Sequence, residues 1–112
     1  MGQIVIVNYR PKPDKDAELM GCVRDHMDVL RKEGLATHRP AVVMRAKDGS
    51  VLEIFEWVSA DAIQKSHTNE AVQALWKRFN EACTYGKLAE LSEAQEMFAT
   101  FEPLHPRLSR GA

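Results

Sequence analysis

The sequence predicts an α+β domain in which strands and helices follow one another in the order β-α-β-β-α-β. The first observation is the stretch "QIVIVNY" (residues 3–9), whose β-branched residues favour a strand. The second is a pair of longer stretches whose apolar residues recur at steps of three and four, as on one face of a helix. The third is "KDGS" between two apolar runs, because Asp-Gly accepts the positive φ of a hairpin turn.

The first strand is apolar at nearly every position up to Asn8, so we expect both of its faces to be covered. "RPKPDK" ends the strand, because proline cannot donate a hydrogen bond to the sheet. Asp14 then caps a helix that runs to about Glu33, and Gly34 ends it. The buried stripe of this helix has His26 near its centre and consists of Leu19, Cys22, Val23, His26 and Leu30.

Residues 35–46 predict a second strand, in which Pro40 marks an edge or a bulge. Residues 51–57 ("VLEIFEW") predict a third strand. Its alternation places one set of side chains on a single face, namely Glu53, Phe55 and Trp57. Ser59 caps a short helix through about Lys65.

Thr68 or Asn69 opens a longer helix that extends to about Tyr85. Its apolar stripe consists of Val72, Leu75, Trp76, Phe79 and Cys83. "GKLAELSEAQ" predicts a loop with a short helical turn, and "EMFATFEPL" (residues 96–104) predicts a last, weaker strand. Residues 1–104 therefore form a single domain, and residues 105–112 form a flexible C-terminal tail.

This order of elements is the ferredoxin-like one, with a four-stranded antiparallel sheet and both long helices on one face. The strands nevertheless have apolar residues on both faces: Leu52 and Ile54 lie on the face opposite Phe55. A single copy would leave the uncovered face in water, at about 25 cal/mol per Å² of apolar surface. We therefore predict a homodimer in which sheet packs against sheet with two-fold symmetry.

The composition excludes several classes of protein. The formal net charge is -1, whereas a nucleic-acid-binding protein needs a basic face. The same architecture serves RNA-binding modules, but "VLEIFEW" has glutamates where these have basic residues. No apolar run approaches the roughly 20 residues of a membrane helix, and no export signal precedes the first strand. Cys22 and Cys83 lack metal-ligand spacing and are expected to be buried free thiols, which predicts a cytoplasmic protein.

Four segments, in this order, resemble the dimeric α+β barrel superfamily: "IVIVNYRPKP", "LRKEGL", "VLEIFEWVS" and "SHTNEAVQALW". They are most similar to its antibiotic biosynthesis monooxygenase (ABM) branch, and the resemblance covers about residues 3–104. The superfamily includes cofactor-free oxygenases, haem-degrading enzymes, isomerases and stress-induced proteins, so the resemblance is more specific for fold than for function.

The resemblance to the cofactor-free oxygenases implies a pocket between helices and sheet that takes a small planar phenolic or quinol-type substrate. A deprotonated substrate would pass an electron to oxygen, while the protein supplies position, a dry cavity and stabilisation of the anion. Asn8 and His67 would orient and polarise the substrate, and His26 would be the base. The walls would be Trp57, Trp76, Phe79 and Tyr85. Neither a metal nor a bound cofactor is expected, although a reduced flavin from a partner protein could act as co-substrate.

Each of these residues also has a purely structural interpretation. Asn8 can end a strand, His26 can be a core histidine bonded to a backbone carbonyl, and His67 can satisfy backbone groups between two helices. The tryptophans can pack the core or a dimer face. The protein would then be a non-catalytic small-molecule-binding or stress-related homodimer, or a structural dimer whose pocket is filled by its own side chains.

The haem-degrading relatives are a further alternative. They have a histidine ligand on the helix after the third strand. Alignment on Trp57 places Trp76 at that position, and His67 falls about nine residues earlier. Because a haem ligand must present a nitrogen to the iron at a fixed place, the sequence does not predict haem binding.

Overall fold

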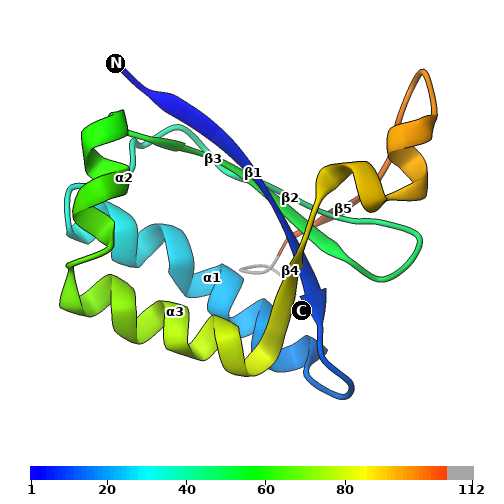
Figure 1. Cartoon of the computed structure of the whole chain (residues 1–112), viewed down its shortest axis with the longest axis horizontal. Coiled ribbons are helices and arrows are strands. Elements are labelled where there is room, and N and C mark those ends of the chain that lie inside the picture. The colour runs from blue at the N-terminus through cyan, green and yellow to red at the C-terminus, as the bar shows by residue number, and fades with distance from the viewer. Residues whose placement is uncertain (106–112) are drawn as a thin grey trace.

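The computed structural model describes residues 1–105 (Figure 1). The strands are β1 (Gln3–Pro11), β2 (Val42–Arg45), β3 (Val51–Trp57), β4 (Cys83–Gly86) and β5 (Glu102–Leu104). The helices are α1 (Asp16–Lys32), α2 (Ala60–Ser66) and α3 (Glu70–Ala82), and two short 3₁₀ turns follow, η1 (Leu88–Glu90) and η2 (Ser92–Gln95). Most of the predicted C-terminal tail, residues 106–112, lies outside the described residues.

The sheet corrects the prediction of four strands: it has five, in the order β4-β1-β3-β2-β5, and all pairs are antiparallel. Its first four members keep the ferredoxin-like order. The strand beside β1 is β4, not the predicted strand at 96–104, and α3 ends at Ala82 instead of Tyr85. Pairing of Tyr85 with Tyr9 in the sheet overrides the helical pattern of the sequence. Only the end of the predicted last strand pairs, as β5 against β2.

The second strand is also shorter than predicted. Only Val42–Arg45 joins the ladder, and Pro40 lies outside it. Ala36 makes an isolated bridge to Trp57, so the chain approaches the sheet once and leaves it again before β2 begins. A proline in this connection cannot donate to a ladder, which explains why continuous pairing starts only after it.

Helix ends follow local chemistry in most places. Gly34 follows α1 with φ of 72°, a conformation that favours glycine. Ser59 caps α2 by accepting from the Ala62 amide at 3.1 Å, and Asn69 caps α3 in the same way. The prediction for Asp14 was wrong: it has φ of 62° in the turn, Lys15 is the N-cap, and no side chain caps α1.

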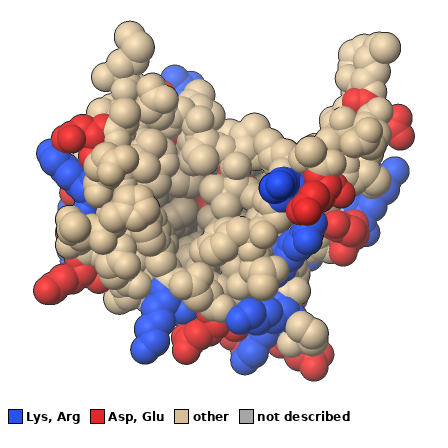
Figure 2. Space-filling view, viewed as in Figure 1, with Lys and Arg blue, Asp and Glu red and all other residues tan. Residues whose placement is uncertain are grey.

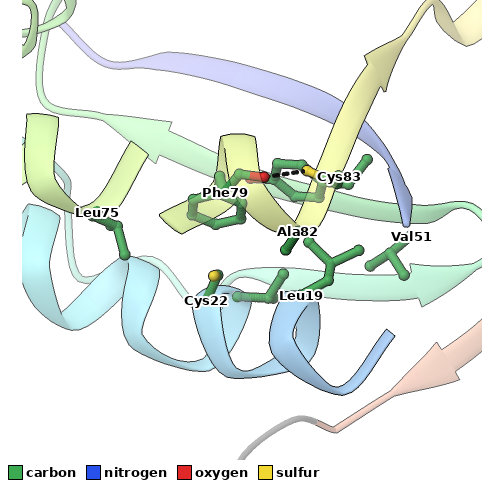
Figure 3. Close-up of a cluster of buried hydrophobic side chains, with 9 residues drawn as sticks. Leu19, Cys22, Val51, Leu75, Phe79, Ala82 and Cys83 are labelled. Atoms are coloured by element: carbon green, nitrogen blue, oxygen red, sulfur yellow. Dashed lines mark hydrogen bonds between the residues drawn. The ribbon is translucent and has the colours of Figure 1, made fainter. Parts of the chain in front are cut away.

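The three helices lie on one side of the sheet (Figure 1). Side chains of α1 and α3 point toward one another and form a buried cluster with β3 and the start of β4 (Figure 3). The predicted stripe of α1 is buried in full, and Met27 joins it. On α3 the stripe is buried at Val72, Leu75 and Phe79, while Trp76 is half-buried. This packing of helices on sheet places the candidate site.

The opposite face of the sheet is covered only in part. At one end Leu52 packs with Ala46 and Leu91, so the chain after β4 covers that corner. At the other end Ile4, Ile6 and Val42 are 60%, 43% and 52% exposed. Both faces of β1 are therefore apolar, as the sequence indicates, but the described part of the chain leaves Ile4 and Ile6 on the outer face exposed.

Both cysteines are free thiols buried in the protein. Cys22 lies on α1, and Cys83 begins β4, where its Sγ approaches the Phe79 carbonyl at 3.2 Å (Figure 3). Burial raises the pKa of Cys22 and raises that of Cys83 to about 11. Because the thiolate is the reactive form, we expect neither thiol of the folded protein to react readily with Ellman's reagent at pH 8, and both to react after denaturation. Rapid reaction of one thiol in the native protein would contradict this placement.

Candidate functional site

A recess opens between the helices and the sheet, with a volume of about 340 Å³. Figure 2 shows it as a hollow lined by uncharged atoms, with charged side chains around the periphery of the molecule. Its lining consists of Val5, Val7, Tyr9, His26, Phe55, Trp57, Trp76, Phe79, Asn80 and Tyr85. The volume lies within the range of small-molecule sites, and a largely apolar wall with few polar groups is typical of them.

The periodicities of the elements explain this lining. Alternate residues of β1 face the helices, beginning with Val5 and ending with Tyr9, and alternate residues of β3 do the same. His26 comes from the buried stripe of α1. Trp76 and Phe79 are three residues apart and share a face of α3. The recess is therefore built from both long helices, two central strands and β4.

One wall of the recess holds a buried polar cluster, which we call the Tyr9–Glu53–His26 cluster. The Tyr9 hydroxyl donates to Glu53 Oε1 at 2.7 Å, and His26 Nδ1 lies 2.7 Å from the same oxygen. Glu53 is fully buried. The Phe79 ring stacks on Tyr9 at 4.9 Å between centroids and meets His26 edge-on at 5.1 Å. Packing thus holds the Tyr9 and His26 side chains where they contact the carboxylate.

The cluster sets the orientation of the imidazole. A carboxylate that accepts from Nδ1–H holds the neutral tautomer in which Nε2 has the free lone pair. Nε2 makes no hydrogen bond to a described residue, and the His26 side chain lines the recess. A histidine held in this way can accept a proton at Nε2, while the carboxylate stabilises the imidazolium that forms.

The burial of the Glu53 carboxylate costs free energy, and filling the core does not require a carboxylate at this position. Its second oxygen, Oε2, is buried without a hydrogen-bond partner among the described residues. An unsatisfied buried polar atom costs about 1–3 kcal/mol, and more when the group is charged. An apolar residue on the inner face of β3 would avoid that cost, as Phe55 and Trp57 do on the same face. The burial of a carboxylate here favours a functional role.

The chain has two tyrosines, and both belong to the site. Burial, followed by the nearby Glu53 carboxylate, raises the pKa of Tyr9 well above its ordinary value, and burial raises that of Tyr85 to about 12. Both phenols therefore remain neutral donors at physiological pH. Tyr9 can keep its hydrogen bond to Glu53 throughout this range.

These tyrosines predict a spectroscopic result. An unfolded tyrosine ionises near pH 10, whereas both folded side chains keep their protons there. The two neutral phenols therefore contribute to the free energy of unfolding. This contribution is fully present below about pH 10 and is lost as pH rises toward 12. We expect no tyrosinate absorbance in the native protein at pH 10, and unfolding by circular dichroism as it appears at higher pH. Ionisation of either phenol near pH 10 without unfolding would contradict the assignment.

The structure brings together five of the seven predicted site residues. His26 lines the recess together with all four predicted wall residues, which are Trp57, Trp76, Phe79 and Tyr85. The structural interpretation of His26 expected a hydrogen bond to a backbone carbonyl. In the structure its partner is the carboxylate of Glu53.

Asn8 and His67 do not line the recess. Asn8 is buried on the opposite face of the sheet, where its Nδ2 lies 3.4 Å from the Lys87 carbonyl. Its position between Val7 and Tyr9 requires this, since successive strand residues point to opposite faces. His67 follows α2 as its C-cap, and its ring meets Trp76 edge-on at 5.4 Å. His67 therefore contacts a wall residue but is itself exposed and outside the recess.

Sequence reasoning missed three polar residues of the site, which are Tyr9, Glu53 and Asn80. It also did not assign the apolar wall residues Val5, Val7 and Phe55 to the site. A signal was present for Glu53, because a glutamate in line with Phe55 and Trp57 lies on an apolar face and must find a partner there. Nothing in the sequence indicated that the partners would be Tyr9 and His26. They lie 44 and 27 residues away along the chain.

Residues 1–105 contain neither a metal-ligand cluster nor a helix suited to cross a membrane. No group of three or more His, Cys, Asp or Glu side chains is placed to hold a metal ion. No helix in this range combines the length and apolarity needed to span a membrane.

The fold and the recess define an α+β protein with a helix-covered antiparallel sheet and a pocket of small-molecule size. Among solved structures, that of Rv0793 from Mycobacterium tuberculosis is similar, with a TM-score of 0.60 and 18% sequence identity. The match covers 75% of this chain and 85% of that chain. At this identity the likeness shows the fold alone. No protein family model matches the sequence, and no curated protein matches it.

Proposed function

We propose that this protein is an ABM-like member of the dimeric α+β barrel superfamily, acting as a cofactor-free monooxygenase on a small aromatic, quinol-type molecule. The observation that carries the proposal is the Tyr9–Glu53–His26 cluster on the wall of an apolar recess. It combines a proton acceptor with a cavity suited to a planar ring. The likeness to the Rv0793 structure supports the fold on which the proposal depends.

In the proposed reaction, His26 Nε2 takes the proton of a quinol hydroxyl. The resulting anion transfers an electron to dioxygen, and the two radicals combine at a ring carbon. The peroxide anion then takes the proton back from His26 to give a hydroperoxide. Loss of water then leaves a hydroxyquinone. One oxygen atom of O₂ replaces a ring hydrogen and the other leaves as water, with all electrons supplied by the substrate. The apolar walls exclude bulk water from the anion and hold the ring in place.

Oxygen uptake tests this function. The purified protein is mixed with a panel of benzene and naphthalene hydroquinones, and uptake is compared with the rate without protein. We expect one or more hydroquinones to consume oxygen faster with protein, and mass spectrometry to find one added oxygen atom that comes from labelled O₂. Tight binding without any acceleration would instead favour a non-catalytic binding protein that uses the same recess. Absence of both would contradict a small-molecule site.

A second copy of the chain is the proposed cover for the exposed end of the sheet. Ile4, Ile6 and Val42 form an apolar surface there, and its burial would remove about 25 cal/mol of unfavourable exposure per Å². A two-fold axis would place this surface against itself. The buried free thiols suit a reducing compartment, so we propose a cytoplasmic homodimer.

Substitution of Ile6 by glutamate tests the dimer. The paired surfaces would bring two carboxylates together in an apolar interface, which is strongly unfavourable. We expect analytical ultracentrifugation to find a dimer for the native protein and a monomer for Ile6→Glu. Ala74→Glu, on an exposed position of α3, is the matched control and should remain dimeric. A native monomer, or a dimer that survives Ile6→Glu, would argue against this interface.

A further inference from the structure

The hydrogen-bonding groups of the recess lie at two separate places. His26 belongs to the buried wall, whereas Asn80 is exposed and Tyr85 is 52% exposed, so these two lie at the rim. Tyr9 also lines the recess, but its hydroxyl is already bonded to Glu53. The remaining wall is apolar apart from the indole N–H groups of the two tryptophans. The recess is thus polar at its inner wall and at its rim, with apolar rings and methyl groups between.

We propose that Asn80 and Tyr85 bind a second oxygen substituent of the ligand, at the end of the ring opposite the hydroxyl that faces His26. The preferred ligand is then a ring with oxygen functions at both ends, such as a hydroquinone or a hydroxylated ring ketone. This inference rests on the proposed function for the role of His26 at the inner end and for the aromatic class of the ligand. Asn80 and Tyr85 would then select ligands that have the second oxygen substituent.

The surroundings of Asn80 leave its side chain free for this task. Its backbone carbonyl accepts from Lys12 Nζ at 2.6 Å, which ties the end of α3 to the chain after β1. Its side-chain amide has no hydrogen bond to any described residue. A primary amide both donates and accepts, so it can pair with a hydroxyl or with a carbonyl of the ligand. Asn80 therefore combines a fixed backbone with an unused polar group at the rim.

Tyr85 is held in a comparable way. It lies directly opposite Tyr9 in the β1–β4 ladder, and the two rings approach at 5.8 Å between centroids. Its hydroxyl makes no hydrogen bond within the described part of the chain. Because its pKa is raised to about 12, it remains a neutral phenol that can donate to a ligand oxygen. Asn80 and Tyr85 thus offer two donor groups, an amide NH₂ and a phenol O–H, and two acceptor oxygens to the outer end of a ligand.

Binding measured without oxygen tests the inference separately from catalysis. The ligands are naphthohydroquinone and naphthol, which differ by one hydroxyl, and calorimetry under anaerobic conditions gives Kd for each. One net hydrogen bond corresponds to about a three- to tenfold change in affinity. We expect the native protein to prefer the diol by at least this factor. Asn80→Leu should weaken the diol about three- to tenfold and leave naphthol within about twofold.

Two further variants sharpen the result. Tyr85→Phe removes only a hydroxyl and should also weaken the diol selectively. Lys77→Leu, at an exposed position of α3 outside the recess, should change neither ligand. Equal affinities of the native protein for the two ligands, equal weakening of both by Asn80→Leu, or no binding of either would overturn the inference. Selective diol binding by a protein that consumes no oxygen would support the inference and refute the proposed catalysis.

Discussion

Replacement of His26 by glutamine is expected to lower kcat for hydroquinone oxidation by about 10²- to 10⁴-fold, the range of a lost general base. Glutamine can still fill part of the space beside Glu53, but it offers no group that takes up a proton near neutral pH. The apolar walls and the rim are unchanged, so KM should change little. The measurement is oxygen uptake under steady-state conditions, with circular dichroism to verify the fold.

A second histidine of the chain provides the control. His67 contacts Trp76 but does not line the recess, so His67→Gln should stay within about threefold of the native kcat. Glu53→Gln tests the positioning of His26: its carboxamide can reach both partners but carries no charge to stabilise an imidazolium. We expect lower kcat with similar KM. Full activity of His26→Gln would show that the cluster does not supply the base.

Replacement of Phe79 by alanine is expected to reduce the free energy of unfolding by about 3–5 kcal/mol. The side chain is 1% exposed and belongs to the main buried cluster, where alanine would leave a cavity (Figure 3). It also stacks on Tyr9 and meets His26 edge-on. Since whole domains have about 5–15 kcal/mol of stability, this loss would be a large share. Urea denaturation followed by circular dichroism measures it.

The matched variant is Phe79→Leu, which keeps most of the buried volume. It should cost clearly less than the alanine variant, because the cavity term is reduced. If both variants cost the same, the loss would come from the aromatic contacts with Tyr9 and His26 and not from the cavity. A loss below about 1 kcal/mol for Phe79→Ala would contradict the burial of this side chain.

Local signals in the sequence located most of the elements. β-branched runs, cap residues and Asp-Gly predicted the first and third strands, the helix starts at Ser59 and Asn69, and the hairpin before β3. Each of these features depends on residues within a few positions of one another. The errors fell where pairing across the sheet competes with local preference. Cys83–Gly86 continues a helical pattern in the sequence, yet β1 offers it a ladder.

The candidate site was predictable to a similar degree. Periodicity alone placed His26, Trp76 and Phe79 on the apolar stripes of their helices, and alternation placed Phe55 and Trp57 together on one face of their strand. Only the structure decided that this face meets the helices. Asn8 was assigned to the site from its place at the end of an apolar strand, but its parity along β1 points it to the other face. The side chain of a polar residue at a strand end can lie on either face of the sheet. Only the register with β3 and β4 decides which face it occupies.

The sequence by itself determined the α+β class, the apolar stripes of the two long helices and the apolar character of both sheet faces, because these follow from spacing along the chain. Only the tertiary structure decided that Glu53 accepts hydrogen bonds from Tyr9 and His26, and that Asn80 and Tyr85 share the rim. The physical reason is that a hydrogen bond requires two atoms within about 3 Å. Residues from β1, α1 and β3 reach such distances only when the packing of helices on the sheet is complete.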